Sequence, residues 1–228
     1  MRTIRLAFLV SGLVGCQLVT GDPTVGQSTD DRVLLPPPRH EGEISVEEAL
    51  RQRRSSREFG RGSLGLADVA QVLWAAQGVT HAAGYRTAPS AGALYPLEIY
   101  LLAGEVADLE AGVYRYLPKE HGLILVRKGD LRERVASAAH SQACIRRAPA
   151  VLVITGIYQR TAKKYGQRAH RYVQIEVGHA AQNVYLQCTA ADLATVFVGA
   201  FADGEMQKVL GLPSDHAPLG LMPLGRIR

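Results

Sequence analysis

Residues 150–157 read AVLVITGI, and this stretch says more about the fold than any other part of the chain. Its near-continuous run of aliphatic and β-branched residues is typical of a strand that is buried on both faces. A sheet that contains such a strand needs a covering layer on each side. The rest of the chain is therefore expected to supply helices as well as further strands.

A helix start is visible before this strand. The sequence SVEE at residues 45–48 is a capping signal. In such a signal Ser45 accepts the backbone N–H of Glu48, and the Glu48 carboxylate reaches back to the start of the helix. The signal predicts a helix that runs to about Arg53.

Apolar spacing and turn residues predict the other elements. Helices are predicted over 66–77, 130–140, about 170–191 and 204–210. Strands are predicted over 97–102, 112–116, 123–127, 195–198 and 219–224. This mixture, with hairpin-like spacing in the middle, indicates an α+β domain built around one sheet.

Composition limits the class of protein. The chain has 228 residues, of which 47% are hydrophobic and 21% charged, and this balance excludes a disordered protein and a collagen-like fibre. Three cysteines are too few for a disulfide scaffold, and whether Cys144 and Cys188 pair is left open. The net charge of +5 comes from scattered residues, so it favours anionic small ligands weakly and gives no reason to expect a nucleic-acid partner.

The amino terminus has the features of a targeting signal. Residues 1–16 place two arginines before an apolar run that is too short to cross a bilayer, as in a secretory signal. The segment ends in LVGC, which resembles the bacterial lipobox and implies lipidation of Cys16. The chain is then expected to be a membrane-anchored lipoprotein facing the periplasm or exterior. A mis-assigned start, with a cytoplasmic protein, is the alternative.

A proline- and glycine-containing segment follows the signal. Residues 17–42 include three consecutive prolines at 36–38 and carry few large apolar side chains. Such a composition predicts a flexible tether. The folded domain is then expected to cover residues 43–228.

Several familiar motifs are absent or out of context. The sequence GRGSLG at residues 60–65 matches a dinucleotide-binding loop in its letters, but no buried strand precedes it. Ser90 lacks the first glycine of a hydrolase elbow, and no pair of histidines has metal-ligand spacing. We therefore predict neither a serine hydrolase nor a metal site.

Three separate segments carry chemical information. Residues 53–59 (RRSSREF) combine guanidinium and hydroxyl groups, as a phosphate site requires, although a solvated basic turn would look the same. Residues 88–96 (APSAGALYP) are small between prolines, so the backbone could approach a flat ligand closely, although an ordinary loop is the alternative. The third segment is VGAF at residues 198–201.

In this order the segments resemble the FMN-dependent nitroreductase family, and most closely its SagB-type dehydrogenase branch. The family pattern R-x-S-x-[RK]-x-F is matched by Arg53, Ser55, Arg57 and Phe59. The pattern P-S-x-G-x-L-x-P is matched by Pro89, Ser90, Gly92, Leu94 and Pro96. The final P-x-G-[RH] is matched by Pro223, Gly225 and Arg226. The resemblance covers roughly residues 43–228 and implies a nitroreductase-like α+β fold, with helices flanking a mainly antiparallel sheet.

The resemblance also implies a site. Arg53 and Arg226 would hold the FMN phosphate, with Arg54 and Ser55 completing the cradle, and Arg57 would lie near the N1/O2 edge of the flavin. The backbone N–H groups of Gly199 and Ala200 would face flavin N5. In the family, a loop of small residues contacts the flavin from the partner subunit of a homodimer. The corresponding residues of this chain are Pro89, Ser90, Ala91 and Gly92. Tyr95 and Tyr172 are candidates for lining the open face, with plain packing as the alternative.

The implied reaction is a ping-pong hydride transfer through flavin N5. A reduced donor such as NAD(P)H would supply the hydride, and a small or peptide-linked acceptor would take it. Because the cofactor carries this chemistry, no catalytic dyad or triad is expected. The alternative is a membrane-anchored protein of the same fold that binds a flavin or another flat ligand without turnover.

Overall fold

The computed structural model describes residues 31–228. The predicted signal segment with Cys16 lies outside the described residues. Within them, seven strands form one sheet in the order β1-β4-β3-β2-β5-β7-β6. Every neighbouring pair of strands is antiparallel, which confirms the predicted α+β class with a mainly antiparallel sheet. The strands are β1 Arg32–Leu34, β2 Leu97–Ala103, β3 Gly112–Leu117, β4 Gly122–Lys128, β5 Ala150–Gly156, β6 Leu193–Thr195 and β7 Ala217–Arg226.

Strand β5 is an inner strand buried on both faces, as its sequence predicts. It pairs with β2 on one side and β7 on the other, and all of its residues are buried. Its side chains alternate between two hydrophobic clusters, with Leu152 and Ile154 in one and Val151 and Val153 in the other. Each fully buried side chain of this kind contributes about 1.5–3 kcal/mol to stability.

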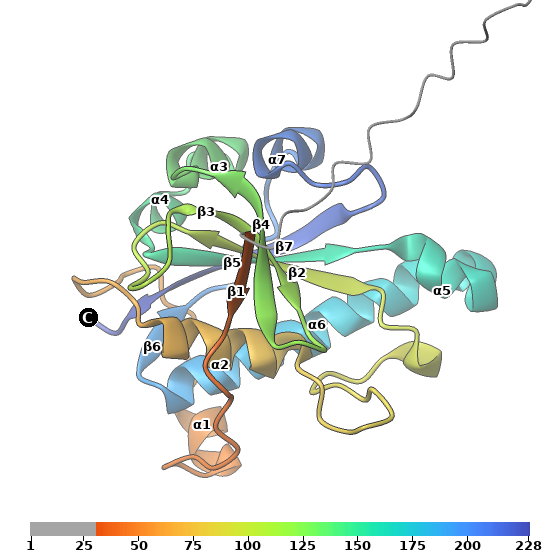
Figure 1. Cartoon of the computed structure of the whole chain (residues 1–228), viewed down its shortest axis with the longest axis horizontal. Coiled ribbons are helices and arrows are strands. Elements are labelled where there is room, and N and C mark those ends of the chain that lie inside the picture. Colours follow the sequence, from red (N-terminus) through yellow and green to blue (C-terminus); the bar gives the residue numbers. More distant parts are fainter. Residues whose placement is uncertain (1–30) are drawn as a thin grey trace, which may run out of the picture.

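Helices cover both faces of the sheet (Figure 1). One face carries α2 Leu66–Gln77 and α6 Ala169–Ala190, and α1 Val46–Gln52 packs against α6 on the same side. The other carries α3 Arg132–Ala138, α4 Ala143–Arg147 and α7 Asp203–Leu210. Helix α5 Tyr158–Tyr165 leads from β5 into α6, and two short 3-10 turns, η2 Ala91–Ala93 and η3 Gly166–Arg168, complete the described chain. None of the helices in residues 31–228 is both long enough and apolar enough to span a membrane.

The sheet separates the two cysteines in this part of the chain. Cys188 packs in the cluster under α2 and α6, and Cys144 packs in the cluster under α3, α4 and α7. Both are buried free thiols. Because they lie on opposite faces of the sheet, they cannot form a disulfide without a large rearrangement.

Part of the segment predicted as a flexible tether is packed against the domain. Strand β1 pairs with β4, and Leu35 is buried. The His121 side chain contacts the carbonyl oxygen of Pro36 at 2.9 Å, and the Arg39 N–H donates to Gln71 Oε1 at 2.8 Å. The tether prediction is therefore wrong for residues 32–39, because an extended edge strand can be held by backbone pairing with few apolar side chains.

Two smaller predictions also differ from the structure. Ser45 caps α1 as expected, but the Glu48 carboxylate turns forward to Arg51 instead of reaching back. The strand predicted over 195–198 is β6, which ends at Thr195, and only Val198 pairs again, with Leu221.

Candidate functional site

The arginine-rich segment lies along the β6–β7 edge of the sheet. After α1 ends, the Ser56 N–H donates to the carbonyl of Thr195 and the Gly60 N–H donates to the carbonyl of Arg226, each at 2.9 Å. Between them the ring of Phe59 packs on Gly225, where an added Cβ would come within 2.7 Å of the ring. Residues from the two ends of the domain are thus brought side by side.

Tyr185 of α6 holds the beginning of this segment. The guanidinium carbon of Arg53 lies over the Tyr185 ring, 5.2 Å from its centroid. The hydroxyl groups of Ser55 and Tyr185 are 3.0 Å apart. Two of the predicted phosphate-binding residues therefore share one aromatic partner that the sequence analysis did not identify.

The remaining predicted arginines are placed differently. Arg226 Nη2 forms an ion pair with Asp68 Oδ2 of α2 at 2.8 Å. Arg54 donates to backbone carbonyls of the α1 terminus, and Arg57 is exposed. The backbones that carry Arg53 and Arg226 converge, but the two guanidinium groups have different partners in this chain. Their joint contact with one phosphate stays a prediction.

The turn at residues 197–200 is fixed from two sides. The Phe197 N–H donates to Tyr185 Oη at 2.7 Å, and Val198 exchanges two backbone hydrogen bonds with Leu221 at 2.8 and 2.9 Å. The next two residues, Gly199 and Ala200, are exposed. Within residues 31–228 their N–H groups have no hydrogen-bond partner, so they are free to donate to a ligand.

A cavity of about 320 Å³ lies between this turn and α6. Gly178, which has no side chain, and Ala181 line the cavity on the α6 side. Phe197 and Tyr185 border it near the turn and the arginine segment. Gln174, Val177, Gln182 and Leu219 complete the lining. Phe197 directly precedes the VGAF segment, and Tyr185 contacts Arg53 and Ser55 of the arginine segment, so the cavity lies next to two of the three selected segments. We take it as the candidate site.

The third segment, the small-residue loop, is anchored by a buried carboxylate. The Ala91 N–H donates to Glu176 Oε1 of α6 at 2.9 Å, and the Tyr95 N–H donates to Ser90 Oγ at 2.8 Å. Burial raises the pKa of Glu176, while its hydrogen bonds from Ala91 and Ser90 act in the opposite direction. Gly92 adopts φ 64°, a left-handed conformation that suits glycine.

This loop lies on the opposite flank of α6 from the cavity. Glu176, which holds the loop, and Tyr185, which borders the cavity, are nine residues apart on one helix. At about 3.6 residues per turn this separation is about two and a half turns, so the two side chains point in opposite directions. A single chain thus keeps the loop away from the cavity.

The two tyrosines predicted for the open face have separate environments. Tyr172 borders a smaller pocket of about 280 Å³ beside Pro89, Ser90 and Ala91, and it meets the Tyr165 ring edge-on at 5.0 Å. Tyr95 packs under the guanidinium of Arg86, 4.6 Å from its ring centroid. Tyr172 lies at the loop, whereas the Tyr95 ring is engaged in packing.

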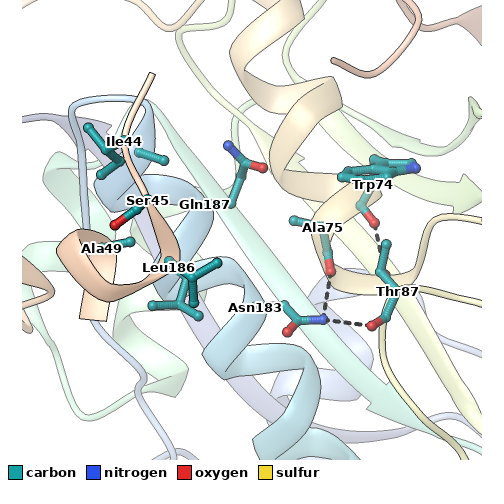
Figure 2. Close-up of a pocket in the computed structure, with 11 residues that line it drawn as sticks. Ile44, Ser45, Ala49, Trp74, Ala75, Thr87, Asn183, Leu186 and Gln187 are labelled. Carbon is teal, nitrogen blue, oxygen red and sulfur yellow. Dashed lines mark hydrogen bonds between the residues drawn. The ribbon is translucent and has the colours of Figure 1, made fainter. Parts of the chain in front are cut away.

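A further pocket of about 270 Å³ lies among α1, α2 and α6. Asn183 donates to the carbonyls of Ala75 and Thr87, at 3.1 and 3.2 Å. Thr87 donates to the carbonyl of Trp74 (Figure 2). No predicted site residue and no charged side chain lines it. Its hydrogen bonds secure the chain just before the small-residue loop.

Tyr185 and Glu176 are the residues that sequence reasoning missed. Both belong to α6, whose small residues predicted close helix packing and gave no reason to expect a site there. A signal did exist for Glu176, because it is the first acidic residue after Glu133 and it lies beside Val173 and Val177 on the apolar face. A carboxylate in such a position requires hydrogen-bond partners.

Comparisons with known proteins show which proteins this chain is similar to. A protein of Methanocaldococcus jannaschii with a provisional nitroreductase name is 46% identical over 184 residues, which cover 81% of this chain and 92% of that protein. A crystal structure from Ralstonia eutropha, of a protein also provisionally described as a nitroreductase, superposes with a TM-score of 0.77 at 30% identity, covering 87% of this chain and 90% of that one.

A relative with a peptide-processing name supports the resemblance to the SagB-type branch. The microcin B17-processing protein McbC of Escherichia coli is 29% identical over 133 residues, covering 56% of this chain and 48% of that protein. The model of the nitroreductase family matches residues 50–226, which is most of the described chain. With the antiparallel sheet and the converging segments described above, these matches show that the chain belongs to the nitroreductase family, a family of oxidoreductases.

Proposed function

We propose that the chain is an FMN-dependent oxidoreductase that works by a ping-pong hydride transfer. The donor would be a reduced nicotinamide such as NAD(P)H, and the acceptor a small or peptide-linked group. The observation that carries the proposal is the convergence of residues 53–60 and 197–200 on Tyr185, which lines a cavity of about 320 Å³ beside α6.

The cavity and the two segments next to it fit such a cofactor. Arg53 and Ser55 offer a cation and a hydroxyl for a phosphate, and the free N–H groups of Gly199 and Ala200 offer donors to the edge of a ring. Gly178 and Ala181 leave room beside the helix for a flat group. FMN would supply the hydride chemistry at N5, and the chain's own residues would bind and orient it.

A symmetric homodimer is part of the proposal. The small-residue loop and the cavity flank α6 on opposite sides, so a loop that contacts the cofactor would have to come from a second copy. Gln174, Ile175 and Gly178 form the exposed face between these flanks, and Ile175 is 49% exposed. A two-fold contact along this face would bring each loop toward the partner's cavity.

The acceptor and the cellular location are also proposed. The name of McbC, a microcin-processing protein, supports a peptide-linked acceptor for this chain. The signal and lipobox at residues 1–16 support anchoring through a lipid on Cys16, with the domain facing the periplasm or exterior.

The test uses the purified full chain and its visible spectrum. We expect a yellow protein, or one that takes up added FMN, whose absorbance near 450 nm is lost when NADH or NADPH is added without oxygen. A yellow protein that dithionite reduces but neither nicotinamide does would overturn the proposed donor. A colourless protein that binds no FMN would refute the cofactor assignment.

A further inference from the structure

Tyr185 joins three parts of the candidate site through one side chain. Its hydroxyl oxygen lies 2.7 Å from the Phe197 nitrogen and 3.0 Å from Ser55 Oγ, and its ring lies under the Arg53 guanidinium. These partners come from the turn before Gly199 and from the arginine segment. The tyrosine itself is half-buried on α6.

One of these hydrogen bonds has a fixed direction. A backbone N–H can only donate, so Tyr185 Oη accepts from Phe197. In the contact between Ser55 and Tyr185 either hydroxyl can be the donor. When Tyr185 donates, Ser55 Oγ accepts, and the proton of the exposed Ser55 can be donated away from the helix.

We propose that Tyr185 is a positioning residue for the phosphate end of the cofactor site, an inference that rests on the proposed FMN-dependent function. Its hydroxyl makes Ser55 a donor toward the phosphate, and its ring holds the Arg53 guanidinium beside that donor. The same hydroxyl fixes the Phe197 N–H and so ties the turn at residues 197–200 to the phosphate segment. Tyr185 acts through these groups and does not itself bind the phosphate.

The geometry separates this role from simple packing. The segment is held to the sheet independently by the bonds from Ser56 to Thr195 and from Gly60 to Arg226. Val198 and Leu221 hold the turn in the same way. Removing the Tyr185 hydroxyl should therefore leave the backbone in place and change only how the donors are aimed.

The experiment compares FMN with riboflavin, which lacks the phosphate, on the full chain. Tyr185→Phe keeps the ring and removes the hydroxyl. We expect its Kd for FMN to rise about tenfold, the scale of one hydrogen bond to a charged group. The Kd for riboflavin should stay within about twofold. Tyr114→Phe is the matched control, since it removes one hydroxyl that donates to the Glu110 carbonyl at 2.8 Å away from the site. It should change neither Kd.

A second variant tests the same bond from the other side. Ser55→Ala should raise the FMN Kd by a similar factor, and the double variant should bind FMN no more weakly than Ser55→Ala alone, because both changes remove one shared interaction. Equal loss of FMN and riboflavin in Tyr185→Phe would mean a packing role and overturn the inference. So would an unchanged FMN Kd, or additive effects in the double variant. A parent chain that binds neither flavin would refute the proposed function itself.

Discussion

Replacing Glu176 by glutamine tests how the small-residue loop is held against α6. The Glu176 side chain is 3% exposed, and its Oε1 accepts the Ala91 N–H at 2.9 Å. Burial raises the pKa of this carboxyl, so the fold favours its neutral form over the carboxylate. A neutral amide of the same shape can still accept from Ala91. Glu176→Gln should therefore change the free energy of unfolding by less than about 1 kcal/mol at neutral pH.

Glu176→Ala is the matched comparison. It leaves the Ala91 N–H without its acceptor, which costs about 1–3 kcal/mol for a buried donor. It also removes a buried methylene group, worth about 0.8 kcal/mol. We expect the alanine variant to lose about 2–4 kcal/mol in urea unfolding followed by circular dichroism.

The pH dependence gives the sign of the effect. Because the pKa of Glu176 is higher in the folded than in the unfolded chain, its contribution to stability is fully present below the ordinary pKa of 4.5 and is lost as the pH rises through the folded value. Glutamine does not titrate. The stability of Glu176→Gln relative to the parent should therefore rise from about pH 4 to about pH 7. A relative stability that falls over this range, or a loss above about 3 kcal/mol at neutral pH, would show that the carboxylate is favourable and refute the reasoning.

Four other changes test separate parts of the molecule. Arg226→Ala should raise the Kd for FMN by about 10- to 100-fold in calorimetric titration, the scale of a charge-assisted bond to phosphate, and unchanged affinity would remove Arg226 from the phosphate site. Gly220→Ala should destabilise the fold by about 1–3 kcal/mol in thermal denaturation, because its Cβ would overlap the Phe197 ring. Burial lowers the pKa of His216, which pairs with Tyr100 at 2.7 Å, so the free energy of unfolding should fall as the pH drops below about 6.5, and His216→Gln should show a shallower fall. Cys16→Ser should move the protein from the membrane fraction to the supernatant, and a variant that stays with the membrane would contradict the lipobox interpretation.

The parts of the fold that could be predicted are those in which local pattern and tertiary packing agree. The buried run of β5 and the apolar spacing of α2 and α6 each reflect burial that the sequence records directly. Strand β1 could not be predicted because it has only three residues and lies just before a run of prolines, and helix α5 could not because its sequence is polar. They are held by pairing and packing with residues far away in the chain.

The candidate site shows the same division at the level of single residues. Arg53, Ser55, Gly199 and Ala200 could be selected because they occur in a recognisable order along the chain. Tyr185 could not, because its importance depends on bonds to Ser55 and Phe197, and these form only after α6 packs beside the β6–β7 edge. The end of β6 depends on the same packing. Strand β6 ends at Thr195, and the Phe197 N–H then donates to Tyr185 instead of to a neighbouring strand.

Helix α6 explains why one chain holds two incomplete halves of a site. Its buried face, with Val173, Val177 and Val184, packs on the sheet, so only its flanks and outer face are open to ligands or partners. On one flank Tyr185 accepts the Phe197 N–H of the turn at residues 197–200. On the other flank Glu176 accepts the Ala91 N–H and holds the small-residue loop. Because the helix is rigid, no local movement can join the two flanks within one chain. If both halves contact one cofactor, the second half has to come from another copy packed along the outer face of α6.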